Sequence, residues 1–183
     1  MRIAAALLTA CLGTTFATSA MAEDFACSKV KLVVPYGAGG SADVATRIVA
    51  DRIGAAMNKT FFVENKGGAS GNIGTQYVAE AAPDGCTLLV NGTVIATFLD
   101  SYTNLRYEPF KDLTPVGGIG ITPTIILTAP SIPATDIKSL VALSKSRANG
   151  LSFANPGYGF QQHLATEEIA QRTGAKFVII PYK

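Results

Sequence analysis

The residues best suited to chemistry stand in two glycine-bearing loops, each between an apolar run and a helix-like stretch. The first, Tyr36–Asp43, follows the β-branched run Val30–Pro35, and the second, Asn155–His163, follows Leu151–Ala154. Ligands of open α/β sheets bind beyond the carboxyl ends of strands, where helix N-termini expose unpaired N–H groups, so both loops are candidate anion sites. Either loop alone is more commonly a plain strand-to-helix turn, but the two together favour binding.

Catalytic machinery is not recognisable in the sequence. It has no G-x-S-x-G elbow, no P-loop and no His-x-x-x-His spacing, and its one histidine is His163. We expect His163, near a helix start, to donate a hydrogen bond to the loop backbone or to a ligand carboxylate. Asp43 has two open explanations: it complements the helix dipole, or it accepts from a hydroxyl or ammonium group of the ligand. The sequence therefore predicts a binding protein that is not an enzyme and uses no metal or cofactor.

A dinucleotide site is the alternative interpretation of the first loop. Gly37–Ala42 fits the fingerprint G-x-G-x-x-[G/A], and Glu64 stands near the position of the acid that binds the ribose. The chain would then be a fragment of a Rossmann-type NAD-dependent oxidoreductase, exported or mis-assigned. Against this, Pro35 closes the strand just before Tyr36, and an exported chain is not expected to meet soluble nicotinamide cofactors.

Strand-like and helix-like stretches alternate along the chain. The predicted strands are Val30–Pro35, Phe61–Glu64, Thr87–Val90, Leu151–Ala154 and Phe177–Ile180. Helical spacing is found over Val44–Met57, Ile73–Ala82, Ile137–Arg147 and His163–Arg172, with Ser41 and Asp136 as candidate caps. Leu113–Ile119 and Thr124–Thr128 are expected to be extended. This alternation predicts βαβ units, an α/β fold and mainly parallel, doubly wound sheets.

Composition and the N-terminus indicate an exported globular chain. Of 183 residues, 48% are hydrophobic and 15% charged, and the formal net charge of +2 is scattered, which gives no indication of nucleic-acid binding. Residues 1–22 read as a secretory signal with a small-x-small cleavage pattern, and a lipid anchor at Cys11 is the alternative. The remaining pair, Cys27 and Cys86, each precede a predicted strand, so we expect a disulfide rather than two buried thiols.

Several motifs occur in a fixed order along the chain. Val33–Asp43 reads VVPYGAGGSAD, Val63–Gly74 reads VENKGGASGNIG, and Ala82–Leu89 reads APDGCTLL. Further along come Gly157-x-Gly159-x-x-x-His163-Leu164 and the closing Pro181-Tyr182-Lys183. Together these strongly resemble the periplasmic solute receptors of tripartite tricarboxylate transporters, the Bug family. The resemblance runs from about Val30 to the last residue, and the ordered set is specific where any single glycine motif is not.

The resemblance implies a type II periplasmic-binding-protein fold, in which two α/β lobes close around a hinge on a small carboxylate. The ligand would be a di- or tricarboxylate, an acidic amino acid or an aromatic acid, delivered to a permease of one large and one small integral-membrane subunit. It also implies a periplasmic location and a monomer at full length. Residues 23–122 would form the first lobe and residues 123–183 part of the second. The implied ligand-binding residues are Tyr36, Ala38, Gly40, Ser41 and Asp43, then Asn91, Gly92 and Thr93, and in the second lobe Gly157, Gly159, Phe160, Gln161 and His163.

Two features depart from the family pattern. Phe160 and Gln161 stand where many members carry small hydroxyl residues, so these side chains would narrow the cleft or replace hydroxyl contacts. The chain also ends at Lys183, where relatives continue to finish the second lobe and return to the first. We therefore expect a truncated form, with the second lobe and the return to the first incomplete, that exposes core surface and aggregates readily by itself.

Overall fold

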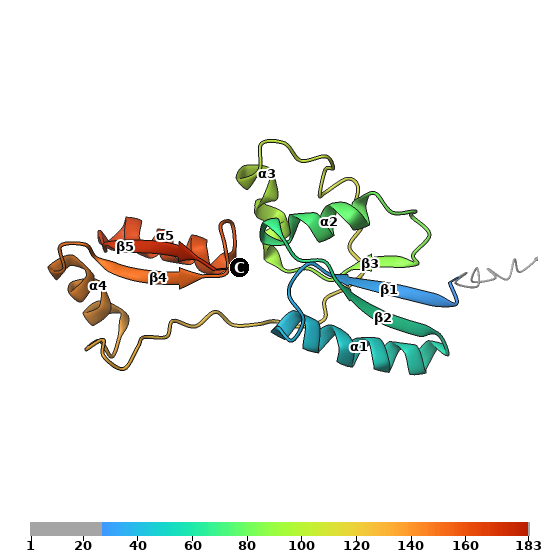
Figure 1. Cartoon of the computed structure of the whole chain (residues 1–183), viewed down its shortest axis with the longest axis horizontal. Coiled ribbons are helices and arrows are strands. Elements are labelled where there is room, and N and C mark those ends of the chain that lie inside the picture. Colours follow the sequence, from blue (N-terminus) through green and yellow to red (C-terminus); the bar gives the residue numbers. More distant parts are fainter. Residues whose placement is uncertain (1–26, 183) are drawn as a thin grey trace, which may run out of the picture.

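The computed structural model describes residues 27–182, whose first part is a three-stranded parallel sheet with helices on both faces (Figure 1). The strands are β1 (Lys29–Val34), β2 (Thr60–Asn65) and β3 (Thr87–Leu89), in the spatial order β2-β1-β3. The helices α1 (Ser41–Met57) and α2 (Asn72–Ala79) connect them and lie on opposite faces of the sheet (Figure 1). The predicted βαβ units are therefore confirmed in this part of the chain.

The central strand β1 is the core of this first sheet. Val30, Val33 and Val34 are fully buried, as expected for a parallel strand that is covered on both faces. Val30 and Leu32 pack against Ala50 of α1 and against side chains of the two flanking strands. The carboxyl end of β1 is thereby fixed in place, and the first glycine loop begins there.

The first loop enters α1 without the cap that the sequence suggested. Gly40 occupies the N-cap position, no side chain caps the helix, and Ser41 is the first helical residue. The prediction that Ser41 caps this helix is therefore wrong. A carboxylate further along α1 binds the loop backbone instead, as described below.

A disulfide joins Cys27 and Cys86, whose Cα atoms lie 5.5 Å apart. Both residues stand next to the amino ends of neighbouring parallel strands, and the Lys31 N–H donates to the Cys86 carbonyl at 2.8 Å. Asp84 lies beside the two sulfur atoms, and these three form the group of potential metal ligands found among residues 27–182. Because the disulfide uses both thiols, this group does not offer a metal two thiolates.

The chain after β3 forms short helices that the sequence did not predict. The 3₁₀ helix η2 (Thr93–Thr97) runs directly into α3 (Phe98–Ser101), and Val94, Phe98 and Tyr107 form a second buried cluster. Tyr36 from the first glycine loop and Phe160 from the second also pack against this cluster. These helices therefore bring the two loops to the same place.

The second part of the chain holds a two-stranded parallel sheet. It comprises α4 (Ile137–Ser146), β4 (Leu151–Asn155), α5 (Gln161–Thr173) and β5 (Phe177–Pro181), with Leu151 opposite Phe177. The predicted cap of α4 is confirmed, because the Asp136 carboxylate accepts from the Ser139 N–H at 2.7 Å in a capping box. The chain thus has the α/β fold with parallel sheets that was predicted.

An extended segment, residues 113–130, connects the two parts (Figure 1). It contains no helix or strand, and beyond Leu113 many of its apolar side chains face solvent: Val116 is 86% exposed, Ile121 97% and Leu127 81%. The predicted lobe boundary at residues 122/123 falls inside this segment and stays a prediction. Among the described residues, no helix combines the length and apolar character needed to cross a membrane. The expected signal peptide and Cys11 lie outside the described residues.

Candidate functional site

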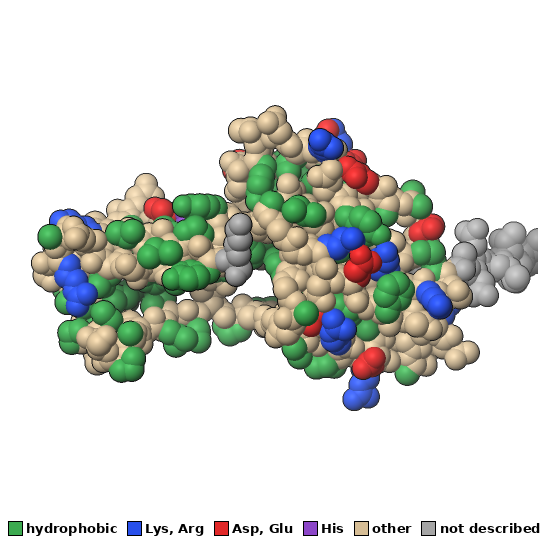
Figure 2. All heavy atoms as spheres, in the orientation of Figure 1, with side chains coloured by type: hydrophobic (Ala, Val, Ile, Leu, Met, Phe, Trp, Pro, Cys, Tyr) green, Lys and Arg blue, Asp and Glu red, His purple; other side chains and the backbone are tan. Residues whose placement is uncertain are grey.

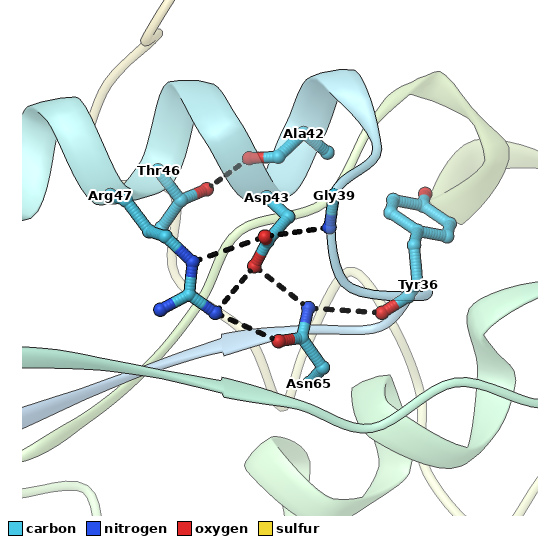
Figure 3. A network of polar contacts seen from close by, with 7 residues as sticks. All are labelled: Tyr36, Gly39, Ala42, Asp43, Thr46, Arg47 and Asn65. Atoms are coloured by element: carbon cyan, nitrogen blue, oxygen red, sulfur yellow. Dashed lines mark hydrogen bonds and ion pairs between the residues drawn. The ribbon is translucent and has the colours of Figure 1, made fainter.

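The first glycine loop is held by a buried carboxylate (Figure 3). Asp43 is 2% exposed; its Oδ2 accepts from the Gly39 N–H at 2.9 Å and from Arg47 Nε at 3.1 Å. Its Oδ1 accepts from Arg47 Nη2 and from Asn65 Nδ2, both at 2.9 Å. Hydrogen bonds from Arg47, above all, hold the pKa of this carboxyl well below its usual range, so Asp43 is charged at neutral pH.

The loop backbone offers donors that the protein itself does not use. Gly37, Ala38, Gly40 and Ser41 are exposed. Within residues 27–182, no group accepts a hydrogen bond from the N–H of Gly37, Ala38 or Gly40. These N–H groups lie at the N-terminus of a 17-residue helix, where the backbone dipole favours negative charge. The loop is therefore suited to an anion.

Tyr36 and the residues after β3 come together as predicted. The Tyr36 hydroxyl donates to Asn91 Oδ1, which also accepts from the Gly92 N–H at 2.7 Å. Asn91 Nδ2 in turn donates to Thr75 Oγ1 at 3.0 Å. Burial raises the pKa of the Tyr36 hydroxyl, so this group is neutral and keeps the proton that it donates to Asn91. This chain of hydrogen bonds positions the Tyr36 ring, which packs against Phe160 of the second glycine loop.

A further loop, residues 66–71, also reaches the second glycine loop, although the sequence analysis gave it no place in the site. Four consecutive residues, Gly68 to Gly71, have positive φ, and two of them are the non-glycine residues Ala69 (47°) and Ser70 (54°). The short helix η1 (Ala69–Gly71) is held by the Tyr102 hydroxyl, which donates to the Ala69 carbonyl at 2.5 Å. Backbone conformations of this kind are typical of functional sites.

The second glycine loop packs directly against the first part of the chain. A Cβ at Gly157 would stand 2.8 Å from Ser70 Oγ, and one at Gly159 would stand 2.8 Å from Ser101 Oγ. Thr97 Oγ1 donates to the Gly159 carbonyl at 2.8 Å. The Phe160 ring lies 5.8 Å, centroid to centroid, from the Tyr36 ring. The structure therefore brings Tyr36, at the start of the first loop, into contact with the second loop.

Two polar side chains of the second loop have unusual partners. Asn155 is 5% exposed; its Oδ1 accepts from the Gly157 N–H at 2.9 Å, but its Nδ2 has no partner among the described residues. His163 Nδ1 accepts from the Gly159 N–H at 3.3 Å, so toward the loop backbone it is an acceptor, not the predicted donor. Its Nε2 lies 3.7 Å from Glu167 Oε1. The prediction that His163 donates to a ligand carboxylate stays a prediction.

A pocket of about 520 Å³ opens where the two parts meet. Its lining residues are Thr93, Thr97, Gly159, Gln161, Leu164, Ala165 and Glu168. Three of these (Thr93, Gly159 and Gln161) were candidate ligand-binding residues, and the other ten candidates do not line this pocket. The sequence analysis missed Leu164, Ala165 and Glu168 as lining residues. The periodicity of α5 could have indicated them, because they share one helical face with the predicted residue Gln161.

Such an arrangement, parallel α/β units whose glycine loops contact each other through Tyr36 and Phe160, is the architecture of the periplasmic binding proteins. Comparison with known proteins confirms this class and identifies the family. The family model described as tripartite tricarboxylate transporter family receptor matches residues 45–183. The chain belongs to this family, as its motifs predicted.

Among curated relatives, Protein BugT of Bordetella pertussis is 33% identical over 96% of this chain and 56% of its own length. A protein of Agrobacterium vitis, from the intergenic region between ttuE and ttuC', is 36% identical over the whole of this chain and 52% of its own length. The chain thus spans about half the length of the curated relatives it matches.

Solved structures agree with the sequence comparison. The periplasmic binding protein BugD superposes with a TM-score of 0.70 at 34% identity, over 85% of this chain and 52% of that one. MatC from Rhodopseudomonas palustris, solved with bound malate, gives 0.72 at 27% identity, over 84% of this chain and 53% of MatC. An R. palustris protein solved with adipate gives 0.70 at 29% identity, over 85% and 52%. The fold is that of the periplasmic binding proteins, of which this chain spans about half. Family membership does not favour the dinucleotide-binding alternative.

Proposed function

We propose that this chain is the carboxylate-capturing part of a periplasmic receptor for a tripartite transporter. The observation that carries the proposal is the meeting of the two glycine loops. The Phe160 ring of the second loop lies 5.8 Å from the Tyr36 ring of the first, and the Gly159 carbonyl accepts from Thr97 of the first part. The helices α1 and α5 each begin at the end of one of these loops, and the positive end of a helix favours negative charge. Two such ends suit a ligand with negative charge.

The proposed ligand is a small organic acid with more than one polar group. The unused N–H groups of the first loop and the unpartnered Asn155 Nδ2 supply donors, and each charge-assisted hydrogen bond contributes roughly 1.5–3 kcal/mol. Malate and adipate, which related proteins bind, are acids of this kind. Gln161 and Glu168 line the pocket and would select among such acids by hydrogen bonding and charge.

The carried-over residues keep distinct roles in this proposal. Backbone donors of Ala38, Gly40 and Ser41 grip one carboxylate, while Gly92 and Thr93 approach from beyond β3. In the second lobe, Gly157 and Gly159 let the backbone come close, and Phe160 with Tyr36 closes the apolar side of the cleft. Lobe closure about the connecting segment would then remove the bound anion from water.

In this proposal the protein binds its ligand and catalyses no reaction. Its single His163 shares no hydrogen bond with a hydroxyl or thiol nucleophile among the described residues. The partners would be a permease of one large and one small integral-membrane subunit, and the location would be the periplasm, as in the family.

Isothermal titration calorimetry of the mature chain with malate, adipate, succinate and citrate tests the proposal. We expect saturable binding of at least one acid and no heat or thermal shift with NAD. Gly159→Val, whose side chain would clash with Ser101 and Thr97 and separate the loops, is expected to abolish binding. Ala56→Val, at an exposed position of α1 away from both loops, is the matched control and should bind like the wild type. Saturable stabilisation by NAD with no response to any acid, in the chain and in a version extended to the relatives' length, would contradict the proposal.

A further inference from the structure

The polar network at the first loop joins residues of α1, of β2 and of the loop itself (Figure 3). Asp43 and Arg47 lie one turn apart on α1, and Asn65 is the last residue of β2. Asn65 Nδ2 donates to the Tyr36 carbonyl at 3.1 Å as well as to Asp43, and Asn65 Oδ1 accepts from Arg47 Nη2 at 3.1 Å. The three side chains therefore form a closed set in which each contacts the other two.

This set fixes the first glycine loop at two points. Asn65 binds the carbonyl of Tyr36, where the loop begins, and Asp43 binds the N–H of Gly39, in its middle. Around Gly37 and Gly39 the space is open, because no atom other than those of their chain neighbours lies within 4 Å of where a Cβ would stand. The direction of the loop's remaining N–H groups thus depends on these hydrogen bonds.

Asp43 has no acceptor capacity left for a ligand. A carboxylate has about four lone-pair sites, and the Asp43 oxygens already accept from Gly39, from Asn65 and twice from Arg47. The bidentate contact with the Arg47 guanidinium also balances the negative charge, which would otherwise repel an anion at the loop. Both facts argue against direct contact between Asp43 and a ligand hydroxyl or ammonium group.

We propose that Asp43, Arg47 and Asn65 act as a loop clamp, which positions the N–H groups of the first glycine loop without touching the ligand. The loop clamp depends on the proposed function only for the identity of the ligand that the positioned N–H groups bind. Asp43 is accordingly a positioning residue, and the prediction that it is a ligand contact is replaced by an indirect role.

Amide hydrogen exchange of Gly39, followed by NMR in the ligand-free chain, tests the loop clamp without any ligand. We expect Asp43→Ala to speed exchange about tenfold or more, since the amide loses a charge-assisted hydrogen bond. Asp51→Ala, which removes an exposed aspartate of the same helix, is the matched control and leaves Gly39 unchanged. Unchanged Gly39 exchange in Asp43→Ala overturns the loop clamp. If that variant does not fold, Asn65→Ala, which leaves Tyr36 without its partner, replaces it, with the same two outcomes at Gly39.

The affinities of three acids that share one carbon skeleton then distinguish a positioning role of Asp43 from direct contact with the ligand. Succinate, malate and aspartate differ only by a hydrogen, a hydroxyl or an ammonium group. We expect Asp43→Ala to weaken all those that bind by one common factor of about tenfold, whereas a loss confined to malate and aspartate overturns the indirect role. If the wild-type chain binds none of the three, the proposed function fails for these acids, while Gly39 exchange still decides the loop clamp.

Discussion

Two glycines of the loop between β4 and α5 occupy backbone positions that side chains resist. Gly157 and Gly159 have φ angles of 140° and 80°, and both approach hydroxyl groups of the first part of the chain. The sequence already indicated these glycines through their place after a strand. It did not indicate Ser70, Thr97 or Ser101, because contacts between residues so far apart in the chain follow from packing and leave no local pattern.

Gly159→Ala is expected to destabilise the chain by about 1–2 kcal/mol, because an L-residue in the left-handed region is strained. The new Cβ would also press on Ser101 and Thr97 at the junction. Urea unfolding measures the effect. Gly37→Ala is the control: Gly37 has no positive φ and open space around it, so its unfolding midpoint is expected to stay unchanged. Equal midpoints for the two variants would contradict this account.

Acidification is expected to weaken the fold through Asp43 and Glu64. Hydrogen bonds from Arg47 hold the pKa of Asp43 below its ordinary value near 4, and hydrogen bonds from Lys31 and Lys66 lower that of Glu64. A carboxyl with a depressed folded-state pKa contributes its full stability above the unfolded-state pKa, and this contribution disappears as the pH falls toward the folded value.

The free energy of unfolding, measured between pH 7 and pH 3, should therefore fall below about pH 4–5. Asp43→Asn removes one of the carboxyl groups whose pKa is lowered in the fold, so the loss on acidification is expected to be smaller in this variant. A pH profile of Asp43→Asn that runs parallel to the wild type would contradict the assigned cause. Asp51→Asn, at an exposed position of the same helix, is the control and should leave the profile unchanged.

At the scale of elements, the sequence predicted those helices and strands whose positions follow from local sequence patterns. The run Val30–Pro35 is β-branched and ends in proline, and β1 lies there; Asp136 and Ser139 form a capping box, and α4 begins there. The helices η2 and α3 were missed because they are too short to show a periodic pattern. The cap of α1 was misassigned because Ser41 satisfies the preference for a cap, while the loop's own geometry places Gly40 there.

The disulfide between Cys27 and Cys86 ties the starts of β1 and β3 across a separation of 59 residues. In the chain-entropy description, closing a loop of this length stabilises the fold by about 4 kcal/mol. Reduction with dithiothreitol is therefore expected to shift the urea midpoint downward, and Cys27→Ala/Cys86→Ala should behave like the reduced wild type. Thiol titration of the unfolded, unreduced mature chain should find no free thiol, and one or two free thiols there would contradict the bond.

At the scale of the whole molecule, apolar surface is distributed unevenly. On the face in Figure 2, charged side chains gather mostly over the first part, whereas hydrophobic groups cover much of the second. The second part rests on two strands, fewer than an independent sheet usually needs, and Val178 and Leu164 are about half exposed. The sequence showed the alternation of strands and helices here, but exposure depends on which neighbours are present, and periodicity does not report it.

The connecting segment gives the sharpest prediction at this scale, since Val116, Ile121 and Leu127 place apolar side chains in water along an unpaired extended backbone. Such a segment offers both hydrophobic surface and free backbone hydrogen-bonding groups, which favours association between chains. Analytical ultracentrifugation of the mature chain at micromolar concentrations is expected to show oligomers, and Ile121→Lys/Leu127→Lys to shift them toward the monomer. Val44→Lys, at an exposed apolar position of α1, is the matched control and should leave association unchanged. A compact, cooperatively unfolding wild-type monomer would show that this exposed segment does not drive association.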